Sequence, residues 1–192
     1  MNRTIIINNK NDYKSFLRKL FFYKYYHFTN FNIKNKIKSS NLIIISKALN
    51  IKNRRDRITY LYDQTVNYLN NYYKEDLCKF TDDKCFVQKQ RNDNSKFGCC
   101  FDCKLVKSGK GCPTSNVSCK LLYCKPAIKN IKKLKIKDIE FLRCFSIFQR
   151  FILKFDFYST REQMIKDLYF GPIYWFIRSI PKGLRLIFKI HN

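Results

Sequence analysis

The stretch DRITYLYDQTVNYLNNYYKED, residues 56–76, has the clearest helical pattern in the chain and leads directly into its cysteine-rich segment. Asp56 suits an N-cap, because its carboxylate can accept hydrogen bonds from the free N–H groups of a first helical turn. Mostly apolar and aromatic side chains then recur at the spacing of one helical face: Ile58, Leu61, Tyr62, Thr65, Leu69, Tyr72 and Tyr73. The pattern predicts a helix over residues 56–76 that packs against the segments after it.

Eight of the nine cysteines follow this helix, between residues 78 and 124. Three of the five glycines lie in the same stretch, where tight turns favour them. Two short turn-forming stretches, residues 81–84 and 107–111, predict hairpins that bring pairs of cysteines together. We therefore expect a loop-rich cysteine module over residues 77–126, with these candidate metal ligands: Cys78, Cys85, Cys99, Cys100, Cys103, Cys112, Cys119 and Cys124.

The spacing of these cysteines is typical of a thiolate metal site. Zn²⁺ takes four ligands in a tetrahedron, and paired cysteine ligands stand two to four residues apart in the chain. Cys100 and Cys103 are separated by two residues, and Cys119 and Cys124 by four. No histidine is near, so an all-sulfur site suits zinc, our first choice, or an iron–sulfur cluster. Cys99 adjoins Cys100, and adjacent side chains usually point apart, so the two cysteines are expected to serve different sites or to leave one thiol free. Disulfides and buried free thiols remain open as alternatives.

Helical patterns flank this module on both sides. Residues 1–55 form a basic, aromatic-rich N-terminal segment, in which residues 13–28 predict a short amphipathic helix and residues 30–41 a polar, lysine-rich connection. Residues 56–76 form the helix that leads into the module. The expected fold class is mainly α: helices flanking a loop-rich cysteine module with short hairpins, with one domain from about residue 54.

Residues 127–192 form the predicted helical C-terminal portion. Apolar side chains from Ile136 to Phe155 recur at helical spacing and predict one long helix, on which Cys144 is a small core residue. The sequence Thr160-Arg161-Glu162-Gln163 matches a capping box, so a second helix is expected to begin there and to end before Gly171. A basic aromatic tail follows.

The formal net charge is +25, and the excess of Lys and Arg is spread along the chain. Lys and Arg outnumber Asp and Glu by 15 to 5 in residues 1–77, by 9 to 4 in 78–124 and by 15 to 5 in 125–192. The coding bias of an AT-rich genome explains part of this excess. A field this positive attracts nucleic acid, other polyanions and anionic lipid.

The tail has its own pattern, which combines aromatic and basic side chains. The simpler interpretation of Tyr174 to Ile177, with Arg178, Lys182 and Arg185, is a final helical segment packed on the domain, with its lysines in solvent. The alternative is peripheral contact with an anionic membrane, in which the basic side chains anchor the aromatic ones. No window reaches the ~18 uninterrupted apolar residues of a membrane span, and neither early isoleucine-rich run resembles a signal peptide.

We therefore expect a bacterial protein of the reducing cytoplasm, where clustered thiols favour metal over disulfides. No phosphate-binding loop, nucleophile elbow or His-Glu-x-x-His motif occurs, so no reaction is assigned. The leading hypothesis is a cysteine-rich metal-binding protein. The alternatives are a basic, nucleic-acid-associated protein with a structural zinc module and an iron–sulfur redox protein.

Two resemblances rest on these residues. The block GCCFDC…GKGCP…SCKLLYC, preceded by RRDRITYLYDQTVNYL and followed by IKDIEFLRCFSIFQRFILKF, resembles a group of uncharacterised cysteine-rich proteins of clostridia and other low-GC bacteria. That resemblance covers about residues 54–170 and implies a coherent module without a mechanism. The cysteines are also similar to those of a bacterial zinc- or iron-chelating domain family, which includes an adjacent pair. Here the adjacent pair opens the Cys-Cys-x-x-Cys motif and the later spacings differ. The second resemblance implies metal chelation alone.

Overall fold

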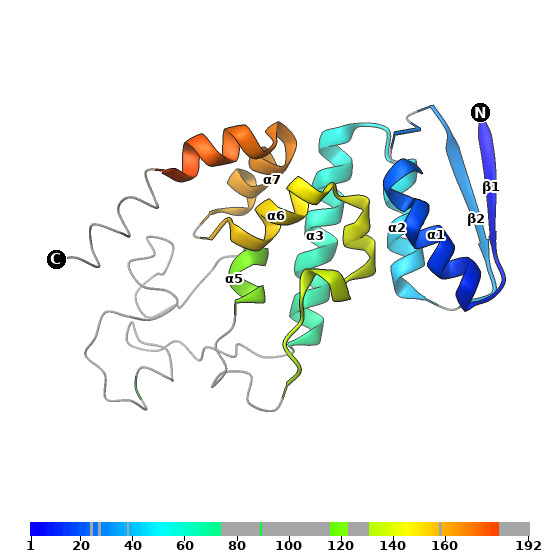
Figure 1. Ribbon diagram of the computed structural model, residues 1–192, viewed down its shortest axis with the longest axis horizontal. Coiled ribbons are helices and arrows are strands. Elements are labelled where there is room, and N and C mark those ends of the chain that lie inside the picture. Colours follow the sequence, from blue (N-terminus) through cyan, green and yellow to red (C-terminus); the bar gives the residue numbers. More distant parts are fainter. Residues whose placement is uncertain are drawn as a thin grey trace.

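The computed structural model describes residues 1–23, 25–26, 28–37, 39–73, 89, 116–122, 131–157 and 159–180. Over these residues the fold is mainly α, as predicted, with one small sheet (Figure 1). The elements are β1 (Asn2–Ile7), α1 (Lys10–Tyr23), β2 (Asn30–Asn35), α2 (Ser40–Asn50), α3 (Arg54–Tyr72), α5 (Val117–Leu121), the 3₁₀ helices η2 (Ile136–Asp138) and η3 (Glu140–Cys144), α6 (Ile147–Phe155), α7 (Arg161–Phe170) and a helix over residues 172–180. The hairpins predicted at 81–84 and 107–111 lie outside the described residues.

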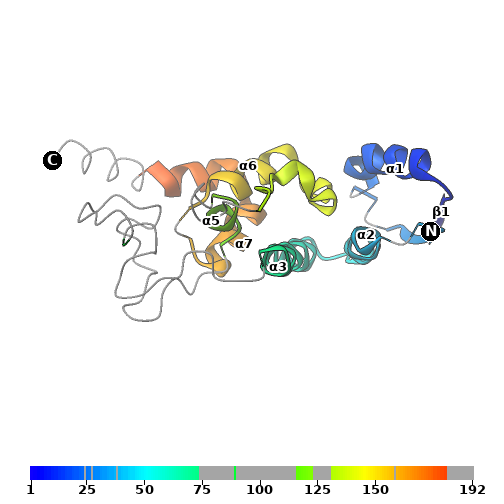
Figure 2. The same ribbon diagram turned by 90° about the horizontal axis from the view of Figure 1, so that it is seen from below.

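The helices lie in two layers, with the strands at one end of the molecule (Figure 2). One layer contains α2 and α3, and the other contains α1 and α6. The 3₁₀ helix η3 contacts α1, α2 and α3. On η3, Glu140 accepts hydrogen bonds from the Tyr13 hydroxyl and, at 3.0 Å, from the Asn41 amide. Buried apolar side chains form one cluster with members on both sides of residue 55.

The N-terminal segment contains a strand–helix–strand unit. β1 and β2 pair in parallel, from Asn2 opposite Asn30 to Ile7 opposite Asn35, and α1 forms the crossover between them. The prediction of a polar connection over residues 30–41 is therefore wrong, because residues 30–35 form a strand. This strand forms its backbone hydrogen bonds with β1, about 28 residues earlier in the chain, and local composition does not reveal such a distant partner.

Two other N-terminal elements differ from prediction in detail. The helix expected over residues 13–28 is α1, which begins earlier because the Asn9 side chain accepts hydrogen bonds from the backbone N–H groups of residues 11 and 12. α2 was not predicted. Its last residue, Asn50, bonds to the backbone N–H and C=O of Phe31 at 2.8 and 2.9 Å, which fastens the helix to β2.

The central helix α3 confirms the strongest sequence pattern. Its predicted core positions are buried, with Tyr72 partly exposed. The predicted N-cap is wrong: Asn53 caps the helix by accepting from the backbone N–H groups of Arg55 and Asp56, at 2.8 and 3.2 Å. Asp56 lies in the first turn, where its carboxylate still complements the positive end of the helix dipole.

The long helix predicted from Ile136 to Phe155 is wrong. Backbone φ/ψ values are extended at Ile139 and Phe145, and Ser146 starts α6 with a capping box to Gln149, with bonds of 3.0 and 3.1 Å. The segment is therefore divided into η2, η3 and α6, although most of its apolar side chains remain buried. Cys144 is a buried core residue, as predicted.

The start and end of α7 follow the prediction. Thr160 Oγ1 accepts a hydrogen bond from the Gln163 backbone N–H at 3.2 Å. The helix ends at Phe170, and Gly171 follows with a φ of 94°, a conformation that glycine adopts without strain. Residues 172–180 then continue as a separate helix beside α6 and α7 (Figure 1).

Candidate functional site

One of the eight predicted metal ligands, Cys119, belongs to the described residues. Cys78, Cys85, Cys99, Cys100, Cys103, Cys112 and Cys124 lie outside them. Within the described part of the chain, no group of three or more His, Cys, Asp and Glu side chains is arranged to hold a metal ion. The ligand assignment from sequence therefore stays a prediction, and the structure informs it through the surroundings of Cys119.

Cys119 lies half-buried on α5, a helix of only five residues. So short a helix is not stable in isolation and needs contacts from elsewhere. Asn116 provides them from the N-cap. Its Oδ1 accepts from the Cys119 backbone N–H at 2.9 Å, and its Nδ2 donates to the carbonyls of Asp156 and Ser159 at 2.9 and 3.0 Å. Asn116 is fully buried, so these bonds are shielded from water.

Two further contacts hold α5 against the helices. Ser118 Oγ donates to the Leu153 carbonyl of α6 at 2.6 Å. Val117 is buried, and its backbone forms a hydrogen bond with the Tyr62 hydroxyl of α3. Burial raises the pKa of the Tyr62 phenol well above its ordinary range, so the group stays neutral. The backbone that carries Cys119 is therefore held in place by α3 and α6.

Asp156 and Ser159, whose backbone carbonyls bind Asn116, also take part in a buried charge network through their side chains. Arg178, from the 172–180 helix, donates to Asp156 Oδ1 at 2.7 Å and Ser159 Oγ at 3.1 Å. It also binds both carboxylate oxygens of Asp167 on α7, with Nε to Oδ1 at 3.0 Å. Arg178 therefore joins the last described helix to the loop that holds α5, so its guanidinium group does not serve as an anchor for a membrane surface.

The network places two buried carboxylates beside one guanidinium group. The pKa of Asp167 is raised to about 6: burial is the largest cause, the neighbouring carboxyl of Asp156 adds to the rise, and Arg178 opposes it. Asp156 Oδ2 is buried and has no hydrogen-bond donor among the described residues. A proton on Asp167 therefore relieves the repulsion between the two carboxylates.

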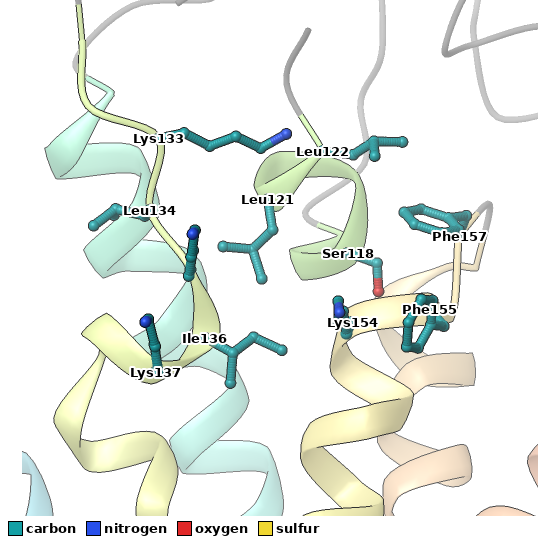
Figure 3. A pocket seen from close by; sticks show the side chains of 11 residues that line it. Ser118, Leu121, Leu122, Lys133, Leu134, Ile136, Lys137, Lys154, Phe155 and Phe157 are labelled. Carbon is teal, nitrogen blue, oxygen red and sulfur yellow. The ribbon is translucent and has the colours of Figure 1, made fainter. Parts of the chain in front are cut away.

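A pocket of about 620 Å³ opens beside α5. Its walls are α5, the end of α6 with Phe157, and the segment of residues 133–137 (Figure 3). Leu121 and Ile136 point into the space between these walls. The described lining residues are Ser118, Leu121, Leu122, Lys133, Leu134, Lys135, Ile136, Lys137, Lys154, Phe155 and Phe157.

The pocket is positively charged, because four of its described lining residues are lysines and none is acidic. Backbone around Lys135 is extended, so neighbouring side chains point to opposite sides, with Leu134 buried and Lys133 and Lys135 exposed. Lys154 lies opposite on α6, its Nζ 4.8 Å from the centre of the Phe155 ring. The sequence patterns did not reveal this pocket, for which the alternation of lysine with apolar residues over residues 133–137 is the available signal.

A second surface exposes large apolar side chains. It lies on α6 and the 172–180 helix, which are joined by an edge-to-face contact between Phe151 and Trp175, with ring centres 5.6 Å apart. Within the described residues, no helix is long and apolar enough to cross a membrane. The exposed side chains are Ile147, Phe148, Phe151, Phe155, Ile173, Tyr174, Phe176, Ile177 and Ile180, which we call the apolar face.

No protein-family model, curated protein or solved structure matches this chain.

Proposed function

We propose that this chain is a metal-binding protein whose cysteine-rich segment, residues 78–124, holds zinc through thiolate ligands. The observation that carries the proposal is the fixed position of α5. Asn116 and Ser118 fasten this helix to the scaffold through buried hydrogen bonds, and Cys119 directly follows Ser118 in the chain. A rigidly held ligand favours metal binding, because less conformational freedom is lost when the site forms.

The chemistry of the donor set supports zinc or an iron–sulfur cluster over hard cations, since thiolates are soft ligands. Metal binding would also supply folding free energy to a segment with many cysteines and turns, so folding and binding would be coupled. We place the protein in a reducing cytoplasm, where thiols stay available to metal. An iron–sulfur centre with a redox role is the variant of this proposal that the same cysteines allow.

The test is metal content after purification without oxygen, together with an absorption spectrum and a thiol titration. We expect colourless protein with bound zinc and thiols that react with a thiol reagent only after chelation. Cys119→Ser should lower the zinc content, whereas Cys144→Ala, which changes a buried core cysteine outside the segment, should leave it unchanged. Bound iron together with visible colour would show that the cysteines hold an iron–sulfur cluster and not zinc. Metal-free protein with few reactive thiols would refute the proposal in favour of disulfides.

A second candidate, peripheral contact with anionic membranes, is favoured by the apolar face. Phe148, Ile173 and Phe176 are 64%, 76% and 60% exposed, which is unusual for neighbouring helices of a monomeric protein. The net charge of +25 complements an anionic lipid surface, and a shallow insertion of aromatic and aliphatic side chains would add to that attraction.

Vesicle co-sedimentation tests this second candidate. Binding should require anionic lipid, and the double variant Phe148→Ser/Phe176→Ser should weaken it. The control is Phe28→Ser/Ile43→Ser, which removes two apolar side chains that are even more exposed, in the N-terminal part of the chain. Equal weakening by both pairs would mean that no particular face inserts, and the candidate would fail.

A further inference from the structure

The pocket beside α5 combines an apolar floor with a rim of lysines, and the metal-binding proposal uses neither. We propose that it is a binding site for an anionic amphiphile: a molecule with an acyl chain that ends in a carboxylate or phosphate group. The inference rests on the shape, lining and charge of the pocket and does not depend on the metal.

The interior of the pocket suits an acyl chain. Its volume of about 620 Å³ falls within the ~300–1,000 Å³ that is usual for small-molecule sites. Leu121 enters from α5 and Ile136 from the opposite wall, while Phe155 and Phe157 close the side next to α6 (Figure 3). A chain that lies among these side chains would remove apolar surface from water on both partners.

The rim suits an anionic head group. Lys133, Lys135 and Lys137 come from one wall and Lys154 from the opposite wall, with no acidic residue among the described lining to offset them. Figure 3 shows the Lys133 side chain extending from its segment toward α5. A carboxylate or phosphate at the mouth of the pocket can contact lysines from both walls, whereas a neutral chain would leave their charges uncompensated.

Both walls are held in place without a ligand. Asn116 and Ser118 fix α5. The lysine-bearing wall is held by the end of α3, since the Tyr72 hydroxyl donates to the Lys132 carbonyl at 2.9 Å and the Leu134 N–H donates to Tyr73 Oη at 3.2 Å. A site with fixed walls loses little conformational entropy on binding, so a modest apolar contact is enough for measurable affinity.

The experiment uses full-length protein and a fluorescent dansyl-labelled undecanoic acid below its micelle concentration. We expect saturable binding that oleate displaces, while dodecanol and inorganic phosphate at the same concentration do not. Displacement by phosphate alone would identify a plain anion site, and equal displacement by an oligonucleotide would identify a polyanion surface. Either result, or the absence of saturable binding, would overturn the inference.

Variants separate the pocket from general charge. Lys133→Ser/Lys135→Ser should weaken probe binding about tenfold, since two exposed ion pairs together contribute about 1.4 kcal/mol. The control Lys36→Ser/Lys166→Ser removes the same charge from exposed residues outside the described lining and should have little effect. Phe148→Ser/Phe176→Ser should bind the probe like wild type, which separates the pocket from the apolar face except for Phe155, which belongs to both. An equal loss in the lysine control would overturn the proposal.

Discussion

Replacing Arg178 by methionine tests the buried network that joins the 172–180 helix to α7. Methionine keeps most of the side-chain volume but removes the guanidinium donors to Asp156, Asp167 and Ser159. Asp156 and Asp167 are 2% and 0% exposed, so water cannot replace the guanidinium group without local opening. We expect the substitution to lower the free energy of unfolding by about 3–5 kcal/mol at pH 7.5, as for other buried pairs that lose one partner.

The cost should depend on pH, because the carboxyl group of Asp167 can take up a proton. In the folded protein its pKa is raised to about 6, so the folded state binds this proton more tightly than the unfolded chain does. Stability therefore falls as pH rises from about 4 through about 6. Arg178 is one of the groups that lower this pKa, so Arg178→Met should make the fall larger. Near pH 4.5 we expect the cost of the substitution to shrink to about 1–2 kcal/mol.

Urea unfolding followed by circular dichroism at both pH values measures these costs. Lys166→Met, on the exposed side of α7, is the control for loss of one positive charge and should change stability by less than about 0.5 kcal/mol. Adding Asp167→Asn to Arg178→Met should recover at least about 1 kcal/mol at pH 7.5, since one unpaired buried charge is removed. A cost below about 1 kcal/mol, or one that is equal at both pH values, would refute this account of the network.

Three further predictions concern other parts of the molecule. Asn116→Ala should lower the free energy of unfolding by about 2–4 kcal/mol, because two buried carbonyls and the cap of α5 lose their partner. Urea unfolding measures this loss, and Asn67→Ala on the exposed side of α3 is the control. Gly171→Ala should cost about 1 kcal/mol in a thermal melt, because its φ of 94° strains any residue with a Cβ while the space around it is open; a neutral result would mean that the backbone relaxes. If the positive charge serves polyanion binding, the affinity for a random-sequence oligonucleotide should fall steeply and log-linearly with salt; binding that is insensitive to salt would contradict that role.

Local sequence patterns were sufficient to predict the helices that bury one face and have capping residues at their ends. α3 has a continuous apolar stripe, and α7 lies between Thr160 and Gly171, which start and stop it through contacts within one turn. The sequence also placed Cys144 in the core. These features follow from side-chain spacing and nearby capping groups, so they need no knowledge of the rest of the chain.

Periodicity alone failed in two segments, one determined by a distant strand and the other by a local helix cap. Residues 30–35 form a strand because β1 supplies their hydrogen-bond partners, and the Ile136–Phe155 pattern is divided because a local Ser146 cap and extended residues compete with helix continuation. The predicted thiolate site stays a prediction of the sequence, since its cysteines other than Cys119 lie outside the described residues.

The amino-acid sequence by itself determined the helical class, the clustered cysteines and the strongly positive charge. Only the tertiary structure brought Asn116 to the carbonyls of Asp156 and Ser159, turned Arg178 inward and set Lys154 across from Lys133. The physical reason is that such contacts join residues tens of positions apart. They form only when the packing of apolar faces has already brought those segments together, and no local pattern encodes them.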